Sequence, residues 1–254
     1  FNFNNQVLRL PFFGYGCSGG VLGLNRAVEI YKNIKKPVLV CNVELCSLTF
    51  RPQIFSKENI VSSSLFGDGS ISYIVTERGN CKILNSMEHT WKDSLNLMGW
   101  GVEDDGLSVI FDKIIPEFIT KKLPQVVNEF PLKDLDGYVL HSGGMKIIDA
   151  YKKIFNNDPT IEVSQKILSE YGNVSSVSVL LVLKEIINSH YLLFLFEFFI
   201  FAFIFSTKFL SKNERIVILF SLSNLVIYLF FIWVIERSLS IDLLIYMLNS
   251  NESL

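Results

Sequence analysis

The sequence lacks the features that mark several common classes of protein. None of its four cysteines, Cys17, Cys41, Cys46 and Cys81, forms a CxxC pair, and its three histidines show no metal-ligand spacing, so we expect no metal site. Four cysteines in 254 residues are too few for a disulfide scaffold, which favours the reducing cytoplasm. The net charge of −2 comes without a basic tract, so nucleic acid is not an expected partner.

The beginning of the chain also lacks a targeting signal. It starts at Phe1 rather than at a methionine, and the opening segment has neither a basic start nor an apolar signal core. No internal repeat or low-complexity linker interrupts the rest of the sequence. We therefore expect the sequence to begin inside a longer protein.

Residues 1–185 have the pattern of an α/β protein, because short β-branched apolar runs alternate with amphipathic stretches. The predicted strands cover 38–43, 70–76, 81–89 and 136–141. The predicted helices cover 18–34, 111–129, 144–155 and 161–171, and a further helix starts near Ser175.

Residues 186–254 differ in composition, and they account for much of the overall hydrophobic content of 50% and the mean hydropathy of +0.36. Residues 216–235 are twenty residues without a charge, the length of a helix that crosses a bilayer. Residues 186–207 form a second apolar stretch. This pattern predicts a hydrophobic α-helical tail with two membrane helices, and the alternative is two buried helices of a soluble protein.

A glycine-rich segment surrounds Cys17 at the start of the first predicted helix. Gly14, Gly16, Gly19 and Gly20 allow tight turns and close approach of a substrate. A cysteine at a helix N-terminus experiences the positive end of the helix dipole, which stabilises a thiolate. These residue types suit covalent acyl transfer, although a buried structural cysteine among packing glycines has the same pattern.

Further blocks follow Cys17 in a fixed order. They are Val43-Glu44-Leu45-Cys46-Ser47-Leu48-Thr49-Phe50, Leu65-Phe66-Gly67-Asp68-Gly69-Ser70, His141-Ser142-Gly143-Gly144 and Tyr171-Gly172-Asn173-Val174-Ser175. Together with the cysteine segment, they resemble the signature blocks of type III polyketide synthases, the chalcone and stilbene synthase family, and more closely its bacterial members. The resemblance covers residues 5–187.

The resemblance implies a thiolase-like αβαβα sandwich, of which residues 1–185 would supply mainly the C-terminal half, and a homodimer. It implies decarboxylative condensation of an acyl-CoA starter with malonyl-CoA, with these CoA thioesters as substrates and no cofactor or metal. Cys17 matches the acyl-accepting nucleophile, and His141 and Asn173 match the other two members of its triad. Taken alone, His141 could be structural and Asn173 could be a helix cap.

The resemblance also implies residues that shape the substrate cavity. Phe66 matches an aromatic gatekeeper, and Val109 falls near a second gatekeeper position, which predicts a wider entrance. The other matching positions are Glu44, a buried acid, Cys46, Thr49 and Ser175. Cys46 could be a reactive thiol or a small wall residue, Phe66 could be a core residue, and Ser175 could be a helix cap.

Two departures from the family keep other functions open. The front of the family sequence and its Gly-Phe-Gly-Pro-Gly-like C-terminal loop have no counterpart, so we expect a tail of unrelated origin, from read-through, frameshift or fusion. The alternatives are a ketoacyl-ACP synthase III-like enzyme and an inactive, membrane-attached fragment. The expected location is a cytoplasmic catalytic region with membrane contact through residues 186–254.

Overall fold

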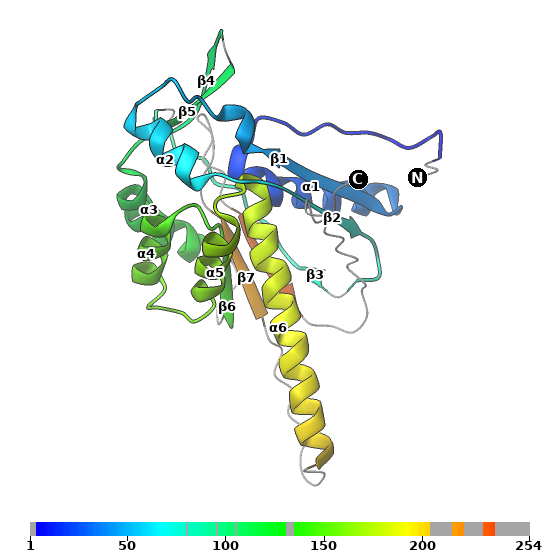
Figure 1. Cartoon of the computed structure of the whole chain (residues 1–254). Coiled ribbons are helices and arrows are strands. Elements are labelled where there is room, and N and C mark those ends of the chain that lie inside the picture. Colours follow the sequence, from blue (N-terminus) through cyan, green and yellow to red (C-terminus); the bar gives the residue numbers. More distant parts are fainter. Residues whose placement is uncertain are drawn as a thin grey trace.

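Two helices, α1 (Gly19–Ile34) and α6 (Ser175–Phe203), pack together at the centre of the fold (Figure 1). The computed structural model describes residues 4–79, 81–94, 96–104, 106–130, 135–203, 215–220 and 231–236. A Cβ atom on Gly20 would lie 2.2 Å from the Ser176 carbonyl oxygen, so the close approach of the two helices requires glycine there. Around this contact, Val21, Leu22 and Val179 are fully buried in one hydrophobic core.

A two-stranded antiparallel sheet lies against both helices. Strand β1 (Val38–Leu45) pairs with β2 (Asp68–Val75), which confirms two predicted strands and extends each by about two residues. Burial alternates along β1 with the period of two that a strand imposes. Asn42 and Glu44 therefore lie on the face that α6 covers, whereas Leu39 and Val43 are exposed.

Three helices form a second core with strand β6 (Gly137–Leu140). They are α3 (Ile115–Glu129), α4 (Met145–Ile154) and α5 (Ile161–Tyr171). The sequence predicted all three, but α3 begins later than residue 111. Phe111 instead ends strand β5, and Pro116 lies in the first turn of the helix, where its missing N–H is not needed.

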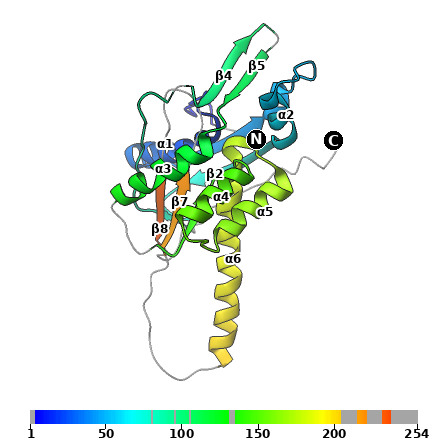
Figure 2. The ribbon, with the colours of Figure 1, turned by 90° about the vertical axis from the view of Figure 1, so that its left-hand side faces the viewer.

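Several elements were not predicted. They are helix α2 (Lys57–Leu65), the hairpin of β4 (Met98–Glu103) and β5 (Gly106–Phe111), and two 3-10 turns, η1 (Gly16–Ser18) and η2 (Cys46–Thr49). The predicted strand 81–89 is reduced to β3 (Lys82–Ile83). The hairpin extends away from the central helices (Figure 2).

The prediction of a helix over 216–235 is wrong at both of its ends. There the chain forms strands β7 (Arg215–Phe220) and β8 (Phe231–Glu236), which pair with each other, and β7 runs parallel to β6. A charge-free run of Ile, Val and Phe suits a strand covered on both faces as well as a helix, and periodicity alone does not separate the two.

Residues 186–203 of the predicted membrane helix over 186–207 belong to one continuous helix, because α6 runs from the core to Phe203 and extends beyond the other elements in both views (Figures 1 and 2). Across the described part of the chain, no helix meets the length and apolarity that crossing a membrane requires. The remaining residues of the predicted tail, 204–214, 221–230 and 237–254, lie outside the described residues.

Candidate active site

Cys17 lies in the turn that leads into α1. Gly14 and Gly16 adopt positive φ angles of 88° and 49°, so the backbone conformation before the cysteine favours glycine. Cys17 occupies the middle of η1, two residues before the first residue of α1, and only 5% of its surface is exposed. The structure thus places the cysteine at the start of a helix, as the sequence predicted.

The electrostatic environment of the thiol is opposite to the expected one. The pKa of Cys17 is raised to about 12, mainly by burial, and the negative charge of Glu44 contributes to this increase. A hydrogen bond with the side chain of Ser175 acts in the other direction but does not offset burial. Desolvation therefore outweighs the helix terminus, and Cys17 is a neutral thiol at neutral pH.

Asn173 is fixed by a backbone clamp between two signature blocks. Its N–H donates to the carbonyl oxygen of Leu65 at 2.8 Å, and its own carbonyl oxygen accepts from the N–H of Gly67 at 3.1 Å. Gly172 has a φ of 70°, and a Cβ atom there would lie 2.6 Å from the Leu65 carbonyl oxygen. Two blocks that are far apart in the sequence therefore lock together around Asn173.

The side chain of Asn173 is bound to backbone groups at both ends. Its Oδ1 accepts from the Ser175 N–H at 2.9 Å, and its Nδ2 donates to the Gly143 carbonyl oxygen at 3.2 Å. The first of these bonds caps the start of α6, as the alternative interpretation of Asn173 predicts. The second places the amide beside the loop that follows His141.

His141 follows β6 and is 3% exposed. A Cβ atom on Gly143 would lie 3.2 Å from its Nε2, so the imidazole ring packs against that glycine. Burial lowers the pKa of His141 to about 4, and within the described structure its Nδ1 has no hydrogen-bond partner. Desolvation therefore favours the neutral form of this ring at pH 7.

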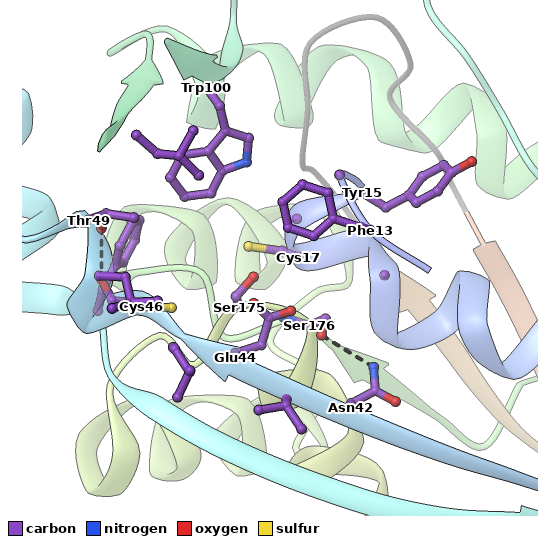
Figure 3. A pocket seen from close by; sticks show the side chains of 18 of the residues that line it. Phe13, Tyr15, Cys17, Asn42, Glu44, Cys46, Thr49, Trp100, Ser175 and Ser176 are labelled. Atoms are coloured by element: carbon purple, nitrogen blue, oxygen red, sulfur yellow. Dashed lines mark hydrogen bonds between the residues drawn. The ribbon is translucent and has the colours of Figure 1, made fainter. Parts of the chain in front are cut away.

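A cavity of about 600 Å³ opens in front of Cys17 (Figure 3). Its wall includes Cys17, Asn173 and every residue that was predicted to shape a substrate cavity, namely Glu44, Cys46, Thr49, Phe66, Val109 and Ser175. His141 is not among the described residues that line it. The structure thus gathers eight of the nine predicted site residues at one cavity, and the ninth packs against Gly143, whose carbonyl oxygen accepts from Asn173.

Sequence reasoning missed four aromatic residues of this wall, Phe12, Phe13, Tyr15 and Trp100. Trp100 on β4 lies directly opposite Val109 on β5 and lines the same cavity, and Phe13 lies beside Cys17 (Figure 3). Side chains that are directly opposite in an antiparallel pair share one face. The prediction of a wider entrance was based on Val109 alone, whereas Trp100 on the neighbouring strand places an indole ring at the same part of the wall. A predicted hairpin at this point would have identified Trp100.

A polar network lies between β1 and the start of α6. The Ser176 N–H donates to Glu44 Oε1 at 3.4 Å, and Asn42 Nδ2 donates to Ser176 Oγ at 3.3 Å (Figure 3). Burial raises the pKa of Glu44 above its ordinary value, and the neighbouring Ser176 and Ser175 act in the opposite direction. The Ser175 side chain therefore lowers the pKa of both Cys17 and Glu44, against the effect of burial.

Comparison with known families accounts for this arrangement. The family model described as "Chalcone and stilbene synthases, N-terminal domain" matches residues 1–78, and the model of the C-terminal domain matches residues 93–192. The chain belongs to the chalcone and stilbene synthase family. Cys17 lies in the part that matches the N-terminal domain, and His141 and Asn173 lie in the part that matches the C-terminal domain.

Individual members of the family show the extent of the similarity. A relative from Bacillus subtilis (strain 168), named "Putative chalcone synthase", is 36% identical over 201 residues, which cover 72% of this chain and 55% of the relative. The 1,3,6,8-tetrahydroxynaphthalene synthase of Streptomyces peucetius subsp. caesius is 30% identical over 197 residues, which cover 71% of this chain and 52% of that enzyme. The chain thus spans about half the length of these relatives.

Solved structures of the family share the fold. The crystal structure of 1,3,6,8-tetrahydroxynaphthalene synthase from Streptomyces coelicolor A3(2) superimposes with a TM-score of 0.75 and 22% identity, over 93% of this chain and 65% of that one. The C-terminal type III polyketide synthase domain of Steely1 from Dictyostelium gives a TM-score of 0.74 and 22% identity, over 93% and 64%. The α/β fold is therefore that of the type III polyketide synthases.

Proposed function

We propose that this chain is an acyltransferase that condenses an acyl-CoA starter with malonyl-CoA through a thioester on Cys17. The observation that carries the proposal is the gathering of Cys17, Asn173 and the predicted cavity residues around one largely apolar cavity. Membership of the family supports it, and so does the relative named tetrahydroxynaphthalene synthase, whose name describes a product of aromatic ring formation.

The proposed reaction has two stages. In the first, the Cys17 sulfur bonds to the acyl carbonyl carbon of the starter, and CoA leaves as a thiol. In the second, malonyl-CoA loses carbon dioxide, and the resulting enolate carbon attacks the Cys17 thioester. A carbon–carbon bond forms and Cys17 is released.

We assign His141 and Asn173 to the enolate oxygen of the second stage. The Asn173 amide lines the cavity, and one of its two N–H groups is left after the bond to the Gly143 carbonyl oxygen. The neutral His141 ring lies against the same glycine and carries one N–H. Such donors stabilise a developing oxyanion more strongly where water is excluded.

A labelling experiment tests the first stage. The 254-residue chain is incubated with radiolabelled acyl-CoA and is then examined for protein-bound label. We expect label on the unaltered chain and none on Cys17→Ala. Cys46→Ala is the matched control, because Cys46 is a second buried thiol in the same cavity wall and its loss should leave the label in place. Label that disappears with Cys46 rather than with Cys17 would overturn the assignment.

A further inference from the structure

One part of the cavity wall is built on a single short turn. The 3-10 turn η2 follows β1 directly, and its two buried side chains, Cys46 and Thr49, both line the cavity. The rest of the turn has little packing, since Ser47 is exposed and Leu48 is 75% exposed. A segment with few buried contacts opens easily unless other interactions hold it. The position of this wall therefore depends on the hydrogen bonds of η2.

The internal hydrogen bonds of η2 hold its shape but do not fix its place in the fold. Thr49 Oγ1 donates to the Cys46 carbonyl oxygen at 2.8 Å (Figure 3), and the Phe50 N–H donates to the Ser47 carbonyl oxygen at 3.1 Å. The residue before the turn, Leu45, provides no side-chain cap. The turn thus lacks the polar residue that usually caps the start of a helix.

A carboxylate from a different strand caps the turn instead. Asp68 is the first residue of β2, and it pairs with Leu45, the last residue of β1. Its Oδ1 accepts from the Ser47 N–H at 2.7 Å, and its Oδ2 accepts from Ser47 Oγ at 2.6 Å. Hydrogen bonds to a carboxylate are shorter and about twice as strong as those between neutral groups. Both oxygens of one side chain therefore hold the beginning of η2.

The backbone before Asp68 is anchored to the segment that contains Asn173. The Gly67 N–H donates to the Asn173 carbonyl oxygen at 3.1 Å, and Asn173 in turn braces the first residue of α6 by accepting the Ser175 N–H at 2.9 Å. A Cβ atom on Gly67 would lie 2.8 Å from the Tyr171 carbonyl oxygen, so the two segments are in close contact. The Asp68 carboxylate therefore projects from a segment that is fixed relative to Asn173.

We propose that Asp68 is a positioning residue that fixes the η2 part of the cavity wall relative to Asn173, and that it thereby limits the length of the acyl chain that the cavity accepts. Neither Asp68 nor Ser47 is among the described residues that line the cavity, so Asp68 acts through η2 rather than on a substrate. The limit on chain length rests on the proposed function, whereas the positioning of η2 does not.

Asp158 provides a matched control elsewhere in the fold. It lies before α5, where it accepts from the Thr160 N–H at 2.9 Å and also from Thr160 Oγ1. These are the same two kinds of contact that Asp68 makes with Ser47. Neither Asp158 nor Thr160 lines the cavity in the described part of the chain. Loss of this carboxylate should lower the melting temperature without moving the cavity wall.

Alkylation of Cys46 by iodoacetamide reports on η2 without any CoA substrate. Cys46 is a buried thiol, so its reaction requires local opening of the turn. Asp68→Ala removes both bonds to Ser47, and the rate at Cys46 should increase about tenfold, as expected for the loss of a hydrogen bond to a charged group. The rate at Cys17, before α1, should change far less. Fragment-ion mass spectrometry on the full chain reads both rates, with the exposed Cys41 as internal reference.

Two substitutions of Ser47 test the same contact while the carboxylate stays in place. Ser47→Ala removes the bond to Oδ2 and keeps the backbone bond to Oδ1, so the increase at Cys46 should be smaller than in Asp68→Ala. Ser47→Thr keeps a hydroxyl group and should retain the unaltered rate. If neither Asp68→Ala nor Ser47→Ala accelerates Cys46, the proposal is wrong. It is also wrong if Cys17 accelerates equally, or if Asp158→Ala has the same effect on Cys46.

The length of the products tests the consequence for function. With acyl-CoA and malonyl-CoA, Asp68→Ala should give a wider range of product lengths by mass spectrometry, whereas Asp158→Ala should give the unaltered products. If the unaltered chain makes no product while Asp68→Ala accelerates Cys46, the proposed function and the limit on chain length are rejected, and the positioning of η2 is retained. If products form with unchanged lengths, Asp68 does not limit chain growth, and that part of the proposal is wrong.

Discussion

The two sides of the candidate active site keep their reactive groups in different surroundings. On one side, Cys17 lies among hydroxyl and carboxylate groups from β1 and the start of α6, at the wall of an open cavity. On the other, His141 is enclosed behind Gly143, and its Nδ1 has no partner in the described structure. Of the two groups, only Cys17 is among the described residues that line the cavity.

Burial acts on the two groups in opposite directions and for one reason. It raises the pKa of the Cys17 thiol to about 12 and lowers that of the His141 imidazole to about 4, because desolvation opposes the charged form of each. The described structure therefore holds a neutral pair rather than a standing ion pair. Reactivity of the thiol therefore requires that its proton moves to a base during the reaction.

The largest expected effect comes from the helix contact that supports the cysteine side. Gly20→Ala places a Cβ atom 2.2 Å from the Ser176 carbonyl oxygen, so α1 and α6 must move apart. We expect the free energy of unfolding to fall by about 3 kcal/mol, the upper range for overpacking, as measured by urea denaturation.

The neighbouring glycine provides the matched control for this prediction. A Cβ atom on Gly19 would meet its nearest neighbour, Ser176 Cβ, at an ordinary 3.5 Å. Gly19→Ala should therefore be neutral, or should stabilise the helix by up to about 1 kcal/mol. Equal losses in the two variants would show that the close contact does not determine stability.

The next largest effect is a decrease in the free energy of unfolding at acid pH, which we attribute to His141. In the unfolded chain a histidine takes up a proton below about pH 6.5, whereas the folded state resists protonation until about pH 4. The contribution of His141 is thus complete above pH 6.5 and is lost as the pH falls toward 4. It amounts to about 3 kcal/mol.

Urea denaturation between pH 4.5 and 7 measures this contribution. The free energy of unfolding of the unaltered chain should decrease toward acid pH, and His141→Asn should show a weaker decrease. His89→Asn is the control, because His89 is partly exposed beside Glu129. If His141→Asn retains the full slope, the buried ring is not the cause.

The smallest effect on stability concerns the outer wall of the cavity. Trp100→Ala removes a partly buried indole and Val109→Phe adds an aromatic ring at the facing position, so the two substitutions change the cavity in opposite directions. Under the proposed function, the first should give longer products from malonyl-CoA and the second shorter ones, as measured by mass spectrometry. Identical products from both variants would place the wall that limits chain growth elsewhere.

The sequence predicted those helices and strands for which the local residue pattern favours the same structure as the tertiary packing. The helix over 161–171 has the predicted bounds, and the strand over 38–43 was found because β-branched residues fill it. Helix α2 was missed because it lacks an apolar face, although Ser56 caps its start by accepting the Asn59 N–H at 3.1 Å. A serine before a polar helix was the signal available for it.

The sequence predicted which residues form the site, but it did not predict the direction in which their pKa values are shifted. Motif order brought out the cavity residues, because four of the five blocks contribute at least one residue to the cavity wall. Burial of the thiol and the imidazole depends on packing from α5, α6 and β6, which single residues do not encode. Likewise, a charge-free run such as 216–235 fits a membrane helix or a covered strand, and only pairing partners such as β6 decide between them.

The clamp around Asn173 has a consequence for how the protein folds. Its two hydrogen bonds join Asn173 to Leu65 and Gly67, so the chain must close a long loop before the brace on Ser175 can form. Contacts between distant segments form slowly, because the entropy of loop closure is lost before they contribute. The environment of Cys17 should therefore be among the last parts of the protein to form. A folding intermediate that already contains α1 and β1 would still lack the contacts around the nucleophile.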